Sequence, residues 1–149
     1  MAEGYATGAS LHEATGHAVA VAFDCGNLKP VAEALRAKYP EARLIVCADN
    51  DQFTEGNPGV TKGREAVEAA GAGLAVPEFA DLAGEPTDFN DLAQREGGAK
   101  VREAIHAALE ALGMPRYHPP PESRAAARIP RRLPVNRRPR PRKSTEASS

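Results

Sequence analysis

Residues 42–51 read ARLIVCADND, an apolar run followed by two aspartates that are separated by one asparagine. A short apolar run followed by turn residues is typical of a buried strand. Side chains two positions apart in an extended backbone point to the same side, so we expect Asp49 and Asp51 to face a common point. A cation between such carboxylates offsets their repulsion, and oxygen ligands favour Mg²⁺ before Mn²⁺ or Ca²⁺. A solvated turn is the alternative interpretation, because Asp and Asn are ordinary turn residues.

The apolar pattern along the chain alternates between helix and strand. This order predicts a parallel α/β sheet with right-handed crossovers, in which ligands bind beyond the carboxyl ends of the strands. Asp24 ends another predicted strand and would share a rim with Asp49 and Asp51, although a turn residue is the better interpretation of Asp24. The predicted strands are 17–23, 42–48 and 73–79, and the predicted helices are 9–15, 28–39, 62–70 and 99–112.

Charge divides the 149 residues into two unequal parts. Residues 1–115 hold nine Lys and Arg against eighteen Asp and Glu, a net charge of −9, whereas residues 116–149 hold ten against two, a net charge of +8. Residues 114–149 also contain eight of the thirteen prolines and little apolar material, so we expect a disordered Pro/Arg-rich tail after a catalytic domain over 1–113. Such a tail either binds phosphates non-specifically or has no role.

Several classes of protein are disfavoured by composition. Cys25 and Cys47 are the only cysteines and form no CxxC motif, so nothing indicates a zinc ribbon or an oxidising compartment. No apolar run reaches the roughly 18–20 residues needed to cross a bilayer, and no basic flank with a long apolar block suggests a signal peptide. We therefore expect a cytoplasmic protein without a membrane partner.

Acidic residues recur in three of the predicted loops. They are Glu3 in a Glu-Gly pair, Asp49 and Asp51 in the DxD stretch, and Asp88 and Asp91 in the stretch DFND. Carboxylates on one rim could hold one or two Mg²⁺ ions, which bridge phosphate oxygens and stabilise attacking and leaving groups. Asp88 has an alternative role as the N-cap of the following helix.

The same stretches resemble the three signatures of the Toprim domain. Residues 3–8 (EGYATG), 48–51 (ADND) and 88–91 (DFND) carry the likeness, which extends over about residues 3–97. Topoisomerases, primases of bacteria and phages, OLD-type nucleases and recombination-repair proteins share this domain. Residues 22–28 (AFDCGNL) and 57–62 (NPGVTK) look like its plasmid and phage primase-helicase branch.

The resemblance implies a Rossmann-like sheet of about four parallel strands between helices. It also implies that Glu3 is the general acid/base or a metal ligand and that Asp49 and Asp51 bind Mg²⁺, with Mn²⁺ as a possible substitute. Asp88 and Asp91 would complete the acidic rim. Lys62 is a candidate phosphate contact, with a solvated lysine at a helix start as the alternative. DNA and nucleotides are the implied partners.

Two departures from the family pattern affect these expectations. Thr7 stands where many primase domains of this family carry a second acid. Only Met1 and Ala2 precede Glu3, where the family has an apolar central strand, so we expect the first strand to be largely missing. The upstream primase or helicase regions of full primases would then belong to another part of the protein or to another chain.

The leading hypothesis is therefore the Toprim domain of a DNA primase-like protein, which catalyses Mg²⁺-dependent nucleotidyl transfer in DNA replication and is a fragment inactive alone. A Toprim-type nuclease or other phosphodiesterase is the second hypothesis. The third is a non-catalytic remnant that binds nucleic acid through the basic residues 128–143. Likeness of fold alone does not separate these three.

Overall fold

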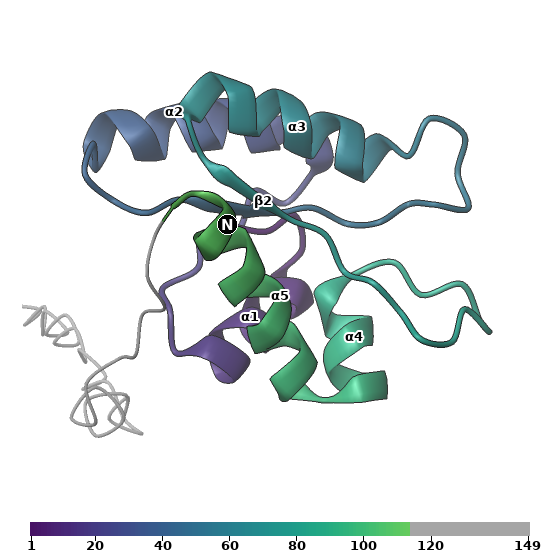
Figure 1. The fold of residues 1–149 in the computed structure, drawn as a ribbon. Coiled ribbons are helices and arrows are strands. Elements are labelled where there is room, and N and C mark those ends of the chain that lie inside the picture. Colours follow the sequence, from purple (N-terminus) through teal and green to yellow (C-terminus); the bar gives the residue numbers. More distant parts are fainter. Residues whose placement is uncertain (114–149) are drawn as a thin grey trace, which may run out of the picture. The chain divides into compact units, whose positions relative to one another are not determined.

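The computed structural model describes residues 1–113, and the tail predicted as disordered lies outside them. The predicted α/β class is confirmed (Figure 1). The elements, in chain order, are α1 (Tyr5–Thr15), the 3₁₀ turn η1 (Cys25–Asn27), α2 (Leu28–Lys38), β1 (Ile45–Cys47), α3 (Pro58–Ala70), β2 (Gly73–Ala75), α4 (Phe89–Glu96) and α5 (Gly98–Ala111).

The sheet is small and parallel. Ile45, Val46 and Cys47 of β1 pair with Gly73, Leu74 and Ala75 of β2. On the other side of β1, Ala2 forms parallel bridges to both Cys47 and Val21. The spatial order is therefore Val21, Ala2, β1 and β2, in which two single bridging residues extend a two-stranded sheet.

The predicted strand over residues 17–23 is wrong as a continuous strand. Only Val21 pairs, because its neighbour in the sheet is Ala2 and a strand needs a partner along its length to extend a ladder. The first strand, which we expected to be largely missing, is represented by the single bridging residue Ala2. Both outcomes follow from the shortness of the central pairing.

Two helical layers cover the sheet, as the ribbon shows (Figure 1). Helices α2 and α3 pack over one face, with Met1, Leu28, Val46 and Ala66 in their core. Helices α1, α4 and α5 pack over the other face, with Ala2, Leu11, Phe89, Val101 and Ile105 in theirs. Met1 and Ala2 thus contribute to opposite layers, as consecutive residues of a strand do.

Two helices begin four residues earlier than expected. Helix α1 begins at Tyr5 and not at residue 9, because Gly4 takes the extended N-cap conformation at φ −95° and ψ 156°. Helix α3 begins at Pro58 and not at residue 62, because the Asn57 side chain accepts from the Val60 N–H and proline suits the first helical position. None of the helices within residues 1–113 is long and apolar enough to cross a membrane.

Candidate active site

The predicted acidic residues follow the carboxyl ends of the central pairing. Glu3 comes directly after Ala2, and Asp49 follows β1 by two residues. The Glu3 carbonyl accepts a 2.7 Å hydrogen bond from the Phe23 N–H, which ties the start of the rim to the neighbouring segment. We call Glu3, Asp49, Asp51, Asp88 and Asp91 the acidic rim.

Asp49 lies at the electrostatic centre of the acidic rim. Burial, followed by the charges of Glu3, Asp88, Asp51 and Asp91, raises the pKa of Asp49 to about 7. All four other members of the rim are therefore near enough to repel its charge. This is the convergence that the order of the sequence motifs predicted.

Glu3 shares this environment. Burial is the main reason that the pKa of Glu3 lies above its ordinary value, and the charges of Asp51 and Asp24 act in the same direction, while a backbone hydrogen bond from Asp49 opposes them. Within residues 1–113, the buried side-chain oxygens without a hydrogen-bond partner are Glu3 Oε1 and Asp49 Oδ1. Unpaired buried carboxylate oxygens are unfavourable and indicate a missing partner of positive charge.

Asp51 is held by the start of α3. Its Oδ2 accepts a 2.9 Å hydrogen bond from the Gly59 N–H, in the first turn of the helix, where the helix dipole favours a negative charge. Gly59 also lies so close to the Asp49 carbonyl that a Cβ would clash with it. A side chain at residue 59 would therefore push the DxD loop away from α3.

Asn50, between the two aspartates, fixes the loop from three sides. Its N–H donates to the Thr87 carbonyl at 2.7 Å, and its side-chain amide donates to the Pro77 carbonyl at 3.1 Å. Its Oδ1 accepts from Asn57 at 2.9 Å. These bonds join the DxD loop to the segment that carries Asp88.

Asp88 and Asp91 form the capping box of α4. Asp88 Oδ1 accepts from the Asp91 N–H at 2.7 Å, and Asp91 Oδ2 accepts from the N–H groups of Thr87 and Asp88. The second Asp88 oxygen accepts from the Thr7 hydroxyl at 2.7 Å. The alternative N-cap role of Asp88 is confirmed, and both carboxylates already have protein partners.

The donor set fits a hard cation, but not a closed protein cage. Among residues 1–113, no three His, Cys, Asp or Glu side chains form a ready metal-binding group. Mg²⁺ is usually bound through only one or two carboxylates and completes its shell with water and phosphate oxygens. The unpaired oxygens of Glu3 and Asp49 supply these two carboxylates.

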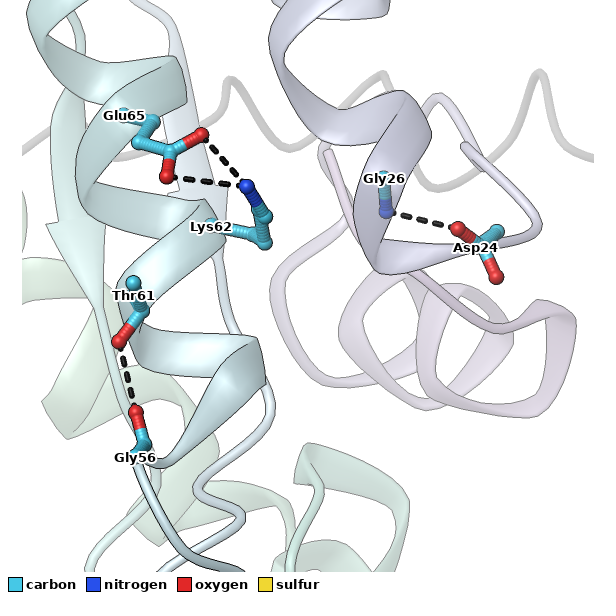
Figure 2. Close-up of polar contacts among 6 residues, drawn as sticks. All are labelled: Asp24, Gly26, Gly56, Thr61, Lys62 and Glu65. Carbon is cyan, nitrogen blue, oxygen red and sulfur yellow. Dashed lines mark hydrogen bonds and ion pairs between the residues drawn. The ribbon is translucent and has the colours of Figure 1, made fainter.

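Lys62 and Asp24 each take part in a local contact within their own segment. Lys62 pairs with Glu65 one turn along α3, with Nζ 3.0 Å from both carboxylate oxygens, and both side chains are about half exposed (Figure 2). Asp24 caps η1 by accepting from the Gly26 N–H at 2.7 Å, so its interpretation as a turn residue is confirmed.

Sequence reasoning did not identify three residues that hold the rim together. Thr7, the replaced second acid, is buried and binds Asp88, 81 positions away. Asn50 and Gly59 act through contacts with distant segments, which the spacing of apolar residues does not predict. The sequence Asn57-Pro58-Gly59 was the one local indication, because it is typical of a helix start. N–H groups in the first turn of a helix have no partner within the helix, so the Gly59 N–H is available to the loop that carries Asp51.

Comparison with known proteins agrees with this geometry. Residues 1–99 match the family model described as the Toprim domain. The chain belongs to the Toprim family. Two relatives from Escherichia coli, each named DNA primase TraC, are 50% and 46% identical to the chain over 84 residues, or 54% of its length. These parts are only 8% and 6% of the relatives' own lengths. No solved structure gives a significant match.

Proposed function

We propose that this Toprim chain supplies the Mg²⁺-dependent nucleotidyl-transfer site of a DNA primase-like protein. The relatives named DNA primase support the reaction class. The main structural support for the metal site is that Glu3 and Asp49 each have a buried carboxylate oxygen without a hydrogen-bond partner. DNA and nucleotides would be its partners, in the cytoplasm, during DNA replication.

Glu3 and Asp49 would hold the metal, with Mn²⁺ as a possible substitute. A Mg²⁺ ion held there would supply positive charge that offsets the negative charge of the nucleotide phosphates during nucleotidyl transfer. Asp51, whose Oδ2 accepts from the Gly59 N–H at the start of α3, would add negative charge beside the metal and would be a further ligand. Asp88 and Asp91 would add negative charge from α4 and complete the rim.

The raised pKa of Glu3 suits the alternative role of general base, in which Asp49 would hold the metal without Glu3. A carboxylate whose proton affinity is increased by burial accepts a proton better near neutral pH. Glu3 would then accept the proton of the attacking 3′-hydroxyl group of the growing primer. Lys62 would contact a phosphate only after leaving Glu65, which makes it the least supported member of the site.

Metal binding provides the first test, on the full chain by isothermal titration calorimetry at pH 8. We expect saturable Mg²⁺ binding that Asp49→Asn weakens at least about tenfold. The matched control is Asp81→Asn, because Asp81 accepts from the Ala83 N–H and is not among the charges that raise the pKa of Glu3 or Asp49, so binding should stay within about twofold. Equal binding by the wild type and Asp49→Asn would overturn the metal assignment.

Activity provides the second test. The chain and a version extended upstream with primase or helicase regions of its relatives are compared in template-directed primer synthesis with Mg²⁺. We expect Asp49-dependent synthesis in the extended form and little in the chain alone. Mg²⁺-dependent nicking of plasmid DNA without synthesis would replace the primase proposal by the nuclease alternative, and DNA binding unchanged by Asp49→Ala would favour a non-catalytic role.

A further inference from the structure

Two strongly exposed aromatic side chains lie beside Glu3, at the end of the sheet that carries the acidic rim. Phe23 is 79% exposed and Tyr5 is 74% exposed. The Phe23 N–H donates to the Glu3 carbonyl at 2.7 Å. Tyr5 is two residues along the chain from Glu3, so their Cα atoms lie within about 7 Å of each other. Aromatic residues therefore flank one of the carboxylates of the candidate active site.

Phe53 occupies a similar position in the loop that follows β1. It comes two residues after Asp51 and is 44% exposed. Single exposed apolar side chains are common on protein surfaces. Here, however, three of the five large apolar side chains that are exposed within residues 1–113 follow the carboxyl ends of the central pairing. The five are Tyr5, Phe23, Tyr39, Phe53 and Leu82.

The backbone at Phe23 is held in an unfavourable conformation. Its φ of 66° is left-handed, which bulky side chains rarely adopt. Hydrogen bonds on both sides keep this turn in place: the Asn27 side-chain amide donates to the Ala22 carbonyl at 3.0 Å, and Asp24 accepts from the Gly26 N–H (Figure 2). The strained turn gains no burial of the Phe23 ring, which indicates a ligand that covers the ring.

The charge of the loops that carry these rings limits what this ligand can be. Residues 2–8, 21–28 and 48–57 contain five Asp and Glu and neither Lys nor Arg. Proteins bind the phosphates of a nucleic-acid strand mainly through Lys and Arg, so these loops would repel a length of strand. A single nucleotide fits better, because a metal ion offsets the charge of its phosphates while its base needs only an aromatic face.

We propose that Phe23, with Tyr5 and Phe53 beside it, stacks on the base of a nucleoside triphosphate whose phosphates share the metal of the acidic rim. This inference rests on the proposed function, which supplies the nucleotide and the metal. Every base has a π-face, so stacking holds all four nucleotides in a similar way. The aromatic residues therefore position the nucleotide and leave the choice of base to the template.

Binding of dATP and of inorganic tripolyphosphate separates stacking from metal binding, because tripolyphosphate carries the phosphates without a base. Both are measured by calorimetry on the full chain with Mg²⁺. Phe23→Leu should weaken dATP binding at least about fivefold and leave tripolyphosphate binding within about twofold. Tyr39→Leu is the matched control, because Tyr39 is 50% exposed but lies at the end of α2, and it should change neither affinity.

A tryptophan at residue 23 reports stacking directly. The chain contains no tryptophan, so Phe23→Trp keeps an aromatic ring and provides a single emission signal that a stacked base quenches. We expect saturable quenching by dATP with Mg²⁺ and none by tripolyphosphate. Deoxyadenosine, which has no phosphates, should quench the emission at millimolar concentration without Mg²⁺. Tyr39→Trp is the matched control and should not be quenched by deoxyadenosine.

Three results would overturn the proposal. They are unchanged dATP binding by Phe23→Leu, an equal loss of dATP and tripolyphosphate binding in that variant, and the absence of quenching in Phe23→Trp. Quenching by single-stranded (dA)₈ at lower concentration than by dATP would assign the rings to a strand instead. Mg²⁺ binding without quenching would reject the stacking alone, whereas quenching by deoxyadenosine in a chain that binds no Mg²⁺ would reject the proposed function and keep the stacking.

Discussion

The two ends of the pairing between Ala2 and β1 differ in what they lack. At the carboxyl end the backbone is tied down by Phe23, Asn50 and Gly59, and what is missing is positive charge beside Glu3 and Asp49. At the amino end the space is lined mainly by apolar side chains, which include Leu35, Ile45 and Leu109. The same short pairing therefore has a charged end, which suits a cation, and an apolar end, which does not.

The rim should be most sensitive at Gly59. Gly59→Val introduces a side chain against the Asp49 carbonyl and about 3.0 Å from Asp51 Oδ2, so the loop or the helix must move. We expect a loss of about 3 kcal/mol in the free energy of unfolding, measured by urea denaturation. Gly4→Ala is the control, because a Cβ there meets only Thr7 Oγ1 at an ordinary 3.5 Å. Equal costs for both changes would show that the close approach at Gly59 does not hold the rim.

The amino end should be most sensitive at Arg36, which donates to four carbonyl groups with its guanidinium. Its acceptors are the carbonyls of Ala70 at 2.8 Å, Pro40 at 2.8 Å, Ala42 at 2.8 Å and Gly71 at 3.2 Å. Arg36→Lys keeps the charge but loses the planar fork, so we expect a loss of about 2 kcal/mol in the free energy of unfolding.

The control for this change is Arg43→Lys, since Arg43 is exposed and lines the same cavity as Arg36. Thermal unfolding of the two variants should differ by several degrees. Similar midpoints would mean that lysine or water satisfies the four carbonyl groups as well as arginine does. Arg36 would then not be the main polar contact that stabilises the amino end.

Thr7 connects α1 to the acidic rim and should have a somewhat smaller effect. Thr7→Val keeps the shape of a side chain that is 1% exposed but removes its 2.7 Å hydrogen bond to Asp88. We expect a loss of about 1.5–2 kcal/mol in the free energy of unfolding, because the acceptor is charged. Thr7→Ser retains the hydroxyl and should recover more than half of it. A serine variant as unstable as the valine variant would assign the effect to packing.

The rim should also make stability depend on pH. Because the pKa of Asp49 is raised from 3.8 to about 7, the folded state binds a proton more tightly than the unfolded state. Stability from this group is therefore fully present below pH 3.8 and is lost as pH rises through about 7. Solvent screens part of the repulsion, so we expect a decrease of about 1–2 kcal/mol.

Urea denaturation of the wild type and of Asp49→Asn at pH 5 and pH 8 measures this term. The variant should be less sensitive to pH and more stable than the wild type at pH 8 without metal. Saturating Mg²⁺ should restore the wild type at pH 8 and leave the variant unchanged. Parallel pH profiles for the two proteins would contradict a shifted titration at Asp49.

Sequence patterns predicted the α/β class and the strand ends at which the acidic residues lie, but not the length of each strand. The DxD spacing and the helix–strand order placed Asp49 and Glu3 on one rim, because the carboxyl ends of parallel strands share one edge. The capping role of Asp88 was also readable as an alternative, since a capping box spans only four residues.

Contacts between distant residues were beyond such patterns. The bond from Thr7 to Asp88 depends on how α1 meets α4, and the limited pairing of residues 17–23 depends on the length of a neighbouring strand. Both are properties of tertiary arrangement, which local propensity does not encode. For the same reason, the cavity that residues 18–20 and 43–45 line together could not be predicted from the sequence of either segment alone.

Variants of Lys62 and Glu65 test whether the candidate site includes a lysine that contacts phosphate. Its pair with Glu65 is exposed, so Lys62→Gln should change the free energy of unfolding by no more than about 0.5 kcal/mol. If Lys62 contacts a phosphate, Glu65→Gln frees it and should strengthen nucleoside triphosphate binding severalfold, whereas Lys62→Gln should weaken binding by a similar factor. Calorimetry with Mg²⁺ present measures all three proteins. Opposite shifts from two neighbours on one helix cannot come from a general loss of stability, and equal affinities would leave Lys62 as a solvated lysine at the start of α3.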